Sequence, residues 1–105
     1  MKMYIVLKNN IPDSLAPVVA AHASLACYRK FQNDYRMSTW IHGIFKKVVC
    51  VASPQEFDQL KDETDYVLLT ESTFKHQEVC LAFCPRKEFP NKFKFLKMWT
   101  PQNIA

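Results

Sequence analysis

Residues 46–60 read KKVVCVASPQEFDQL, and this stretch decides the fold. Its opening run KKVVCVA is rich in valine, which is typical of a buried β-strand. Ser53, Pro54 and Glu56 then stand at the spacing of a capping box, in which the serine caps the first turn of a helix and the glutamate bonds back to the cap. We therefore predict a strand that passes directly into a helix, which runs to about Glu63.

The same patterning predicts further strands on either side of this stretch. The six-residue link STFKHQ joins the last two strands and is too short for a parallel crossover, so we expect those strands to be antiparallel. With helices between the other strands, the order is β-α-β-α-β-β. The chain is predicted to be one α/β domain over residues 1–105, a four-stranded mixed β-sheet with α-helices packed on its faces in αβα layers. The expected strands are 3–8, 46–52, 66–71 and 78–84.

Local signals also place the ends of the first helix and one turn. Asp13 or Ser14 is the expected N-cap of a helix that holds Pro17 in its first turn and runs to about Phe31. The small side chains of this helix let it lie close to a sheet. Gly43 is the only glycine of the chain, and we expect a left-handed backbone there, just past a short helical turn.

Length and composition limit the function. The chain has 105 residues, of which 49% are apolar and 23% charged, and no apolar run approaches the ~20 residues of a membrane span. A single glycine excludes glycine-rich nucleotide-binding loops, and no His/Cys spacing suits zinc, so we expect no cofactor and no metal. No cysteine belongs to a CxxC pair, so we expect buried, reduced thiols and a cytoplasmic location. The cysteines are Cys27, Cys50, Cys80 and Cys84.

The positive charge lies toward the carboxyl-terminal end. Residues 1–84 hold nine Lys or Arg and nine Asp or Glu, so the formal charge of +4 comes from residues 85–105. There the basic side chains alternate with Phe89, Phe93 and Phe95, a pattern that suits a polyanion with rings available for stacking. The alternation in KFKFLK suits equally well a segment whose rings pack inward and whose lysines are solvated. The candidate nucleic-acid-binding residues are Arg86, Lys87, Lys92 and Lys94.

Several short segments, spread over most of residues 3–99, form a recognisable pattern when they are taken in order. AHASLACYRK contains a histidine beside a small-residue run that ends in Tyr-Arg-Lys, and TESTFKHQ forms a polar loop between two apolar strands. In this order the segments resemble the peptidyl-tRNA hydrolase II family, the hydrolase type of archaea and eukaryotes. The helix resembles the family's Ser-His-Ala motif, and the loop stands at its Asp-Ala-Gly-Arg-Thr sequence. The matching segments are MYIVLK, AHASLACYRK, KKVVCVASPQEFDQL, TESTFKHQ, VCLAFCP and FLKMW.

The resemblance implies hydrolysis of the ester between a peptide and the 3′ end of tRNA, a reaction for which no metal is required. Such a reaction needs an oriented water, a base or hydrogen-bond relay, and donors for the tetrahedral oxyanion. His22 matches the family's histidine, and Glu71 stands at its loop aspartate. Thr73 and Lys75 stand roughly at the loop glycine and threonine, and these four residues are the expected catalytic set. The implied partner is tRNA, and a homodimer is implied as well.

Departures from the family pattern leave other functions open. The segment PDSLAP replaces the family's Gly-Lys-Gly-Lys sequence, and Val19 stands at its glutamine. One alternative is a non-catalytic RNA- or protein-binding module on the same fold. Another is a small-molecule hydrolase that uses the same cleft, with Glu71 and His22 as an acid–base pair. The residues also have plain structural interpretations, since His22 suits helix packing, and Thr73 and Lys75 suit a solvated turn.

Overall fold

The structure of the protein is a computed structural model that describes residues 1–102; residues 103–105 of the predicted domain lie outside the described part. It is an α/β fold with a mixed sheet, as predicted, in the strand order β3-β4-β1-β2-β5. The sheet has five strands rather than four, because the two residues of β5 pair with the edge of β2. The strands are β1 (Lys2–Lys8), β2 (Lys46–Ala52), β3 (Tyr66–Glu71), β4 (Gln77–Phe83) and β5 (Lys97–Met98).

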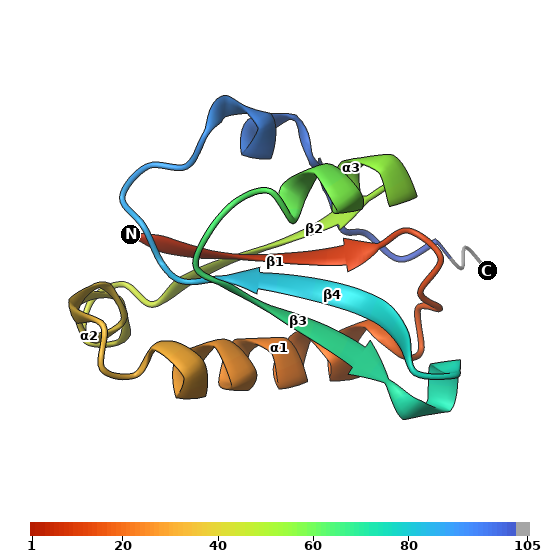
Figure 1. Cartoon of the computed structure of the whole chain (residues 1–105), viewed down its shortest axis with the longest axis horizontal. Coiled ribbons are helices and arrows are strands. Elements are labelled where there is room, and N and C mark those ends of the chain that lie inside the picture. The colour runs from red at the N-terminus through yellow and green to blue at the C-terminus, as the bar shows by residue number, and fades with distance from the viewer. Residues whose placement is uncertain (103–105) are drawn as a thin grey trace.

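The strand directions bring three strand ends to one side of the sheet. β1 and β2 are parallel, with Lys2 opposite Lys46 and Lys8 opposite Ala52. β4 is antiparallel to both β1 and β3, as the short STFKHQ link predicts, so β3 runs in the same direction as β1. Strands β1, β2 and β3 therefore end on the same side, at Lys8, Ala52 and Glu71, and we call this side the carboxyl edge (Figure 1).

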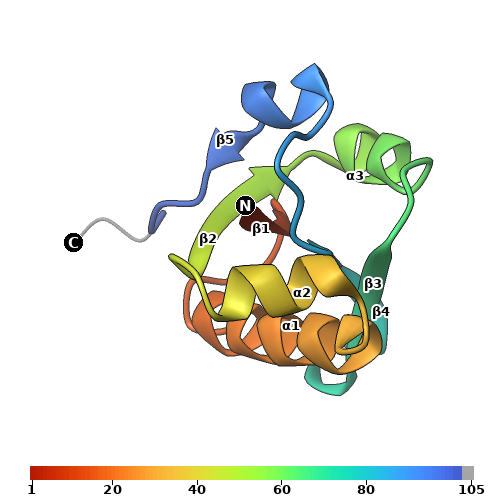
Figure 2. The same cartoon turned by 90° about the vertical axis from the view of Figure 1, so that its left-hand side faces the viewer.

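Helices cover both faces of the sheet, which gives the predicted αβα layers. The helices α1 and α2 lie on one face, and α3 lies on the other together with the segment that returns to β5 (Figures 1 and 2). Because β1 leads into α1 and β2 leads into α3, the chain leaves two neighbouring parallel strands toward opposite faces. The helices are α1 (Ala16–Phe31), α2 (Tyr35–Ile41) and α3 (Pro54–Leu60), and the 3-10 segments are η1 (Ser72–Phe74) and η2 (Asn91–Phe95).

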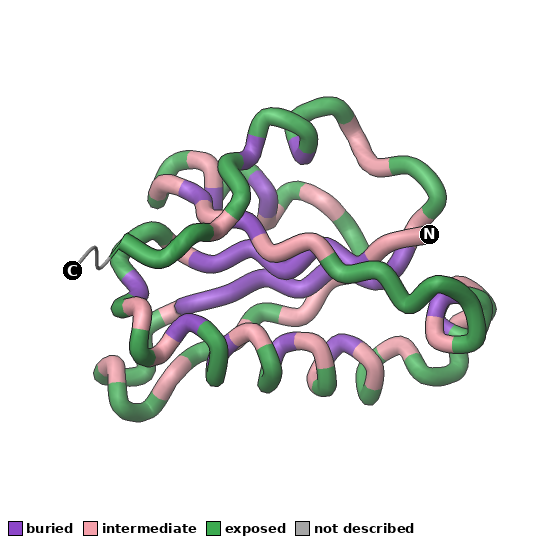
Figure 3. Tube along the Cα trace, turned by 180° about the vertical axis from the view of Figure 1, so that it is seen from behind, coloured by how far each residue is buried: buried purple, intermediate pink, exposed green. Residues whose placement is uncertain are grey.

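The side chains of β1 divide the core between the two faces. Met3, Ile5 and Leu7 belong to the cluster that contains α1, and Tyr4 and Val6 belong to the cluster that contains α3. All five side chains are buried, and β1 and β4 are covered along most of their length (Figure 3). The two faces therefore hold the fold together, and polar chemistry is confined to the ends of the strands.

The capping box after β2 is confirmed. The Glu56 amide donates to the Ser53 hydroxyl at 3.1 Å, and the Ser53 amide donates to the Glu56 carboxylate at 2.9 Å. The helix α3 ends at Leu60 rather than Glu63, because the amides up to Glu63 bond three residues back instead of four. The signal therefore located the start of α3 and overestimated its length.

The predicted cap of α1 is wrong. The residue before the helix is Leu15, and neither Asp13 nor Ser14 caps it with a side chain. The Asp13 carboxylate instead accepts the Gln102 amide at 2.7 Å, a contact with the other end of the chain. The Asp13 carboxylate thus bonds a residue that is distant in the sequence, instead of capping the helix as the neighbouring residues predicted.

The predicted left-handed backbone at Gly43 is also wrong. The positive φ falls two residues later, at Phe45, where it is 65°. The Phe45 ring lies against the Trp40 ring, with centroids 4.5 Å apart, and the Lys47 ammonium lies 3.2 Å from the Phe45 centroid. These ring contacts accompany a conformation that glycine adopts more readily.

The prediction of buried, unpaired thiols is confirmed for all four cysteines. Burial raises the pKa of Cys27 and of Cys80 to about 12, and the pKa of Cys50 and of Cys84 to about 11. The thiols are therefore protonated at neutral pH, and none of them serves as a nucleophile in this state.

Candidate functional site

The predicted catalytic histidine and glutamate line one cavity at the carboxyl edge. It has a volume of about 350 Å³, and we call it the His22 cavity. It is formed by the first half of α1 and by a stretch distant from α1 in the sequence, which comprises the end of β3, Ser72 of η1, His76 and the start of β4. Its lining residues are Val19, His22, Leu69, Thr70, Glu71, Ser72, His76 and Val79.

The helix α1 presents His22 to this cavity. The face of α1 that lies on the sheet carries small or thin side chains, among them Val19, Ala23 and Cys27, which are buried. His22 precedes Ala23 in the sequence, but it is turned by about 100° around the helix and is exposed. The packing interpretation of His22 is therefore wrong, and its imidazole is accessible to a solute in the cavity.

Thr73 holds Glu71 rather than lining the cavity. The Thr73 hydroxyl and amide donate to the Glu71 Oε1 atom at 3.1 and 3.3 Å. Glu71 is the last residue of β3 and is half-buried, so the carboxylate is not sealed from water. Within residues 1–102 no donor bonds its Oε2 atom, which leaves that oxygen to accept from water or substrate. The structure thus makes Thr73 a positioning residue for Glu71.

The turn after η1 brings in a residue that the sequence did not indicate. Lys75 and His76 both have left-handed backbones, with φ of 56° and 57°. The reversal places the His76 side chain in the lining, and its amide donates to the Glu71 carbonyl at 2.9 Å. Lys75 is exposed and outside the lining, so its predicted place in the cleft is wrong. Neither Gly nor Asn marks this turn, which is why the sequence offers no signal for it.

The cavity offers groups that transfer protons. His22 and His76 contribute imidazoles, Glu71 contributes a carboxylate, and Thr70 and Ser72 contribute hydroxyls. In the part of the chain that the structure describes, no set of three or more His, Cys, Asp or Glu side chains is arranged to hold a metal ion. That part also contains no helix with the length and apolar character needed to cross a membrane.

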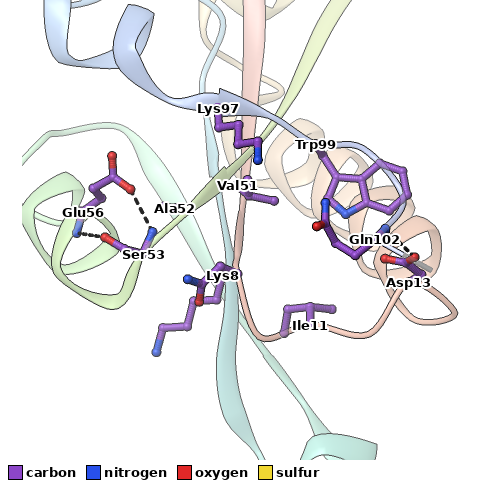
Figure 4. Close-up of a pocket in the computed structure, with 11 residues that line it drawn as sticks. Lys8, Ile11, Asp13, Val51, Ala52, Ser53, Glu56, Lys97, Trp99 and Gln102 are labelled. Carbon is purple, nitrogen blue, oxygen red and sulfur yellow. Dashed lines mark hydrogen bonds between the residues drawn. The ribbon is translucent and has the colours of Figure 1, made fainter. Parts of the chain in front are cut away.

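A second depression lies between the ends of β1 and β2, where the chain leaves toward opposite faces (Figure 4). Its volume is about 390 Å³, and we call it the carboxyl-edge crevice. Open α/β sheets commonly bind ligands at such a point. The crevice shares no lining residue with the His22 cavity. Its lining residues are Lys8, Asn9, Ile11, Asp13, Val51, Ala52, Ser53, Glu56, Lys97, Trp99 and Gln102.

A third depression lies at the opposite side of the sheet, where β1 begins. Its volume is about 310 Å³, and we call it the basic hollow because its charged groups are three lysines and one glutamate. The Tyr4 ring contacts the rings of Phe89 and Phe93, with centroids 4.8 and 5.0 Å apart, so these two rings pack inward, whereas the Phe95 ring is 82% exposed. The lining residues are Lys2, Tyr4, Lys87, Glu88, Phe89, Asn91 and Lys94.

The structure divides the four predicted nucleic-acid-binding residues into two pairs. Arg86 and Lys92 both face Glu63, with nitrogen–oxygen distances of 4.0 and 2.8 Å, so this one carboxylate compensates one of the two positive charges, and Lys92 is the closer partner. Lys87 and Lys94 line the basic hollow, and neither forms an ion pair within residues 1–102. The sequence did not indicate Lys2, which joins them because its position is set by β1 rather than by the carboxyl-terminal segment.

Comparison with known proteins leaves the family open. Neither family models nor curated proteins include a match to this chain. The likeness to the peptidyl-tRNA hydrolase II family is therefore carried by the residue pattern described above, and the family's activity enters as a proposal.

The geometry of the His22 cavity suits acid–base chemistry on a substrate that approaches from solvent. A carboxylate with one oxygen held by Thr73 and the other unbonded is oriented to accept a proton. The two imidazoles, from α1 and from the turn before β4, line the same cavity as this carboxylate. Such a set of groups can activate water against an ester and protonate the departing alcohol.

Proposed function

We propose that the protein hydrolyses the ester between a peptide and the 3′ end of tRNA, in the manner of the peptidyl-tRNA hydrolase II family. The observation that carries this proposal is the meeting of His22 and Glu71 in one cavity. These residues match the family's histidine and loop aspartate, and they come from α1 and β3, which are distant in the sequence. Lys75 has no part in the proposed chemistry, because it lies outside the cavity lining.

In the proposed reaction, Glu71 Oε2 accepts a proton from water as the water oxygen attacks the ester carbonyl. The carbon–oxygen bond to the ribose then breaks, and an imidazolium, from His22 or His76, protonates the departing ribose oxygen. The products are a free peptide and tRNA with a 3′-terminal hydroxyl. Thr73 keeps Glu71 Oε1 occupied, which directs the other oxygen of the carboxylate at the water.

The basic hollow supports a nucleic-acid substrate, because it concentrates positive charge that nothing within residues 1–102 neutralises fully. Along the strands it lies about 20 Å from the carboxyl edge, as estimated from the length of β1 at ~3.3 Å per residue, and it lies on the α3 face of the sheet, whereas the His22 cavity lies on the α1 face. We propose that the tRNA backbone spans this distance, with its acylated end at the His22 cavity and phosphates at Lys2, Lys87 and Lys94. The cytoplasmic location and the homodimer stay predictions.

The experiment is a single-turnover assay with peptidyl-tRNA and no added metal, followed by release of the peptide. We expect Glu71→Gln to lower the rate at least a hundredfold and His22→Ala at least tenfold, since general acid–base groups contribute about 10²- to 10⁴-fold. His76→Asn decides which imidazole protonates the ribose oxygen, because only the donor is needed for that step. Lys75→Gln is the matched control from the same turn, and we expect less than a twofold change.

Binding without cleavage favours a second function. If the folded protein binds tRNA and releases no peptide, the proposed chemistry is wrong, and the basic hollow supports the non-catalytic RNA-binding module instead. If it neither binds tRNA nor cleaves it, the His22 cavity is better tested with small carboxylic esters, as the small-molecule alternative requires.

A further inference from the structure

The carboxyl-edge crevice has the form of a ligand site that the proposed hydrolysis does not use. Its floor is apolar, formed by Ile11, Val51 and Ala52 at the ends of β1 and β2. Polar side chains surround this floor, and the volume of about 390 Å³ falls within the range of small-molecule sites, about 300–1,000 Å³. The crevice opens where neighbouring strands send the chain to opposite faces, the place at which α/β sheets bind ligands.

The walls of the crevice are held in place before any ligand arrives. Lys97 pairs with Val51 in the sheet, and the Trp99 amide donates to the Val49 carbonyl at 2.9 Å. Further along, the Gln102 amide donates to the Asp13 carboxylate, which ties the segment to the loop after β1. The indole and the lysine thus project from anchored backbone, and binding costs little ordering of the chain.

The charged side chains of the crevice differ in whether they already have a partner in the protein. Two lysines and two carboxylates line it, but the Glu56 carboxylate accepts the Ser53 amide at 2.9 Å and the Asp13 carboxylate accepts the Gln102 amide at 2.7 Å. Lys8 lies over the Phe57 ring, 4.9 Å from its centroid. Lys97 forms no ion pair or hydrogen bond through its ammonium within residues 1–102. It therefore supplies a donor to a ligand rather than to the protein.

Figure 4 shows how these groups face one another. The Lys97 side chain extends over Val51, between Ser53 and Glu56 on one side and the Trp99 ring on the other. An indole face beside an uncommitted ammonium suits a flat ring that carries an anionic group. Trp99 is half-buried, so part of its ring is accessible to such a partner.

We propose that the carboxyl-edge crevice binds a nucleoside monophosphate, with the base stacked on Trp99 and the phosphate bonded by Lys97. Aromatic stacking and a charge-assisted bond together make a ring with a phosphate a better ligand than either part alone. The side-chain amide of Asn9 in the lining supplies donors and an acceptor for the edge of a base, and Gln102 supplies its Oε1 as an acceptor, because its Nε2 already donates to the Thr100 carbonyl at 2.9 Å. The shared chemistry is that of a free nucleotide or of one nucleotide in an RNA strand.

The test is a titration of the full chain with AMP, followed by NMR of the two tryptophan indole N–H signals. Trp99→Phe assigns the signals. We expect the Trp99 signal and the amides of Lys97 and Ser53 to shift and to saturate below about 5 mM AMP. The Trp40 signal is the internal control, because Trp40 is buried and its indole N–H is bonded to the Lys46 carbonyl. If the Trp99 signal does not shift at about 10 mM AMP, a concentration above the millimolar Kd of a weak specific complex, the proposal is overturned.

Adenosine and inorganic phosphate test the two halves of the proposal. We expect each to bind at least fivefold more weakly than AMP, and equal binding of phosphate alone overturns the stacking role of Trp99. The RNA trinucleotide AAA distinguishes the sources: tighter binding than AMP points to a nucleotide within a strand, and weaker binding points to a free nucleotide. Both of these outcomes support the site.

Matched lysine variants complete the test. Lys97→Gln is expected to weaken AMP binding about fivefold to tenfold, as the loss of one charge-assisted hydrogen bond requires. Lys46→Gln removes the same charge at the opposite side of the sheet, where Lys46 pairs with Lys2, and should leave AMP affinity within twofold. Equal effects of the two variants overturn the assignment of Lys97. AMP has no acyl ester, so the result stands whether or not the protein cleaves peptidyl-tRNA.

Discussion

Replacing Lys94 by glutamine, with Lys92→Gln as its control, separates a phosphate contact from general positive charge. Both lysines belong to η2 and both substitutions remove one charge. Lys94 lines the basic hollow and has no ion-pair partner within residues 1–102, whereas the Lys92 ammonium lies 2.8 Å from the Glu63 carboxylate. Only Lys94 is therefore placed to release a counterion from RNA when the complex forms.

The expected magnitude follows from counterion release. Each phosphate neutralised on a single strand contributes about 0.7 to the slope of log Kobs against log salt concentration, and about 0.9 on a duplex. Lys94→Gln should lower the slope by about 0.7–0.9 and weaken binding about fivefold at low salt. Lys92→Gln should change the slope by less than about 0.3, because its charge is already compensated by Glu63.

Fluorescence anisotropy of labelled tRNA, measured between roughly 50 and 200 mM KCl, gives the slope for each variant. Over this interval the affinity of a protein that contacts several phosphates falls strongly with salt. Lys87→Gln provides a second test, since Lys87 lines the same hollow from a different segment. An equal decrease of the salt-dependence slope in Lys92→Gln and Lys94→Gln would refute the reasoning. It would mean that Lys92 contacts an RNA phosphate in spite of its ion pair with Glu63.

Further predictions concern stability and thiol reactivity. Bonds from Arg36 lower the pKa of Asp34 to about 2, so its contribution to stability is complete above pH ~4 and is lost as the pH falls toward 2. Asp34→Asn should cost about 1 kcal/mol at pH 7 in urea unfolding and flatten that acid dependence; an unchanged pH profile would contradict this assignment. Ser53→Ala removes one half of the capping box and should cost about 1 kcal/mol, with Ser24→Ala, whose hydroxyl bonds only the carbonyl three residues back, close to neutral in the same unfolding assay. The four buried thiols should resist Ellman's reagent at pH 8 and react together in denaturant, and fast reaction of a native thiol would show that the core opens.

Local sequence signals predicted most of the fold. Apolar runs located the four long strands, and the Ser53–Glu56 capping box located the start of α3, because both depend on neighbouring residues. The two residues of β5 escaped prediction since a strand of that length has no periodicity of its own and exists only through its bonds to β2. The cap expected at Asp13 failed for the related reason that Gln102, far along the chain, competes for the same carboxylate.

The candidate site was predicted in part. His22 and Glu71 were expected to meet, and they line one cavity; Thr73 bonds Glu71 from outside the lining, and Lys75 points elsewhere. His76 could not be identified from the sequence, because two successive left-handed residues without glycine bring it there.

The sequence by itself determined the α/β class, the antiparallel direction of the strands 66–71 and 78–84, the buried thiols and the location of the excess positive charge, because these follow from periodicity, link length and composition. Only the tertiary structure decided which charges are available. Glu63, from a distant segment, pairs with Lys92 at 2.8 Å and lies 4.0 Å from Arg86, while Lys2, at the other end of the chain, joins Lys87 and Lys94 in the basic hollow. Charge is a property of each residue, but its compensation depends on distances of a few ångströms between residues that only folding brings together.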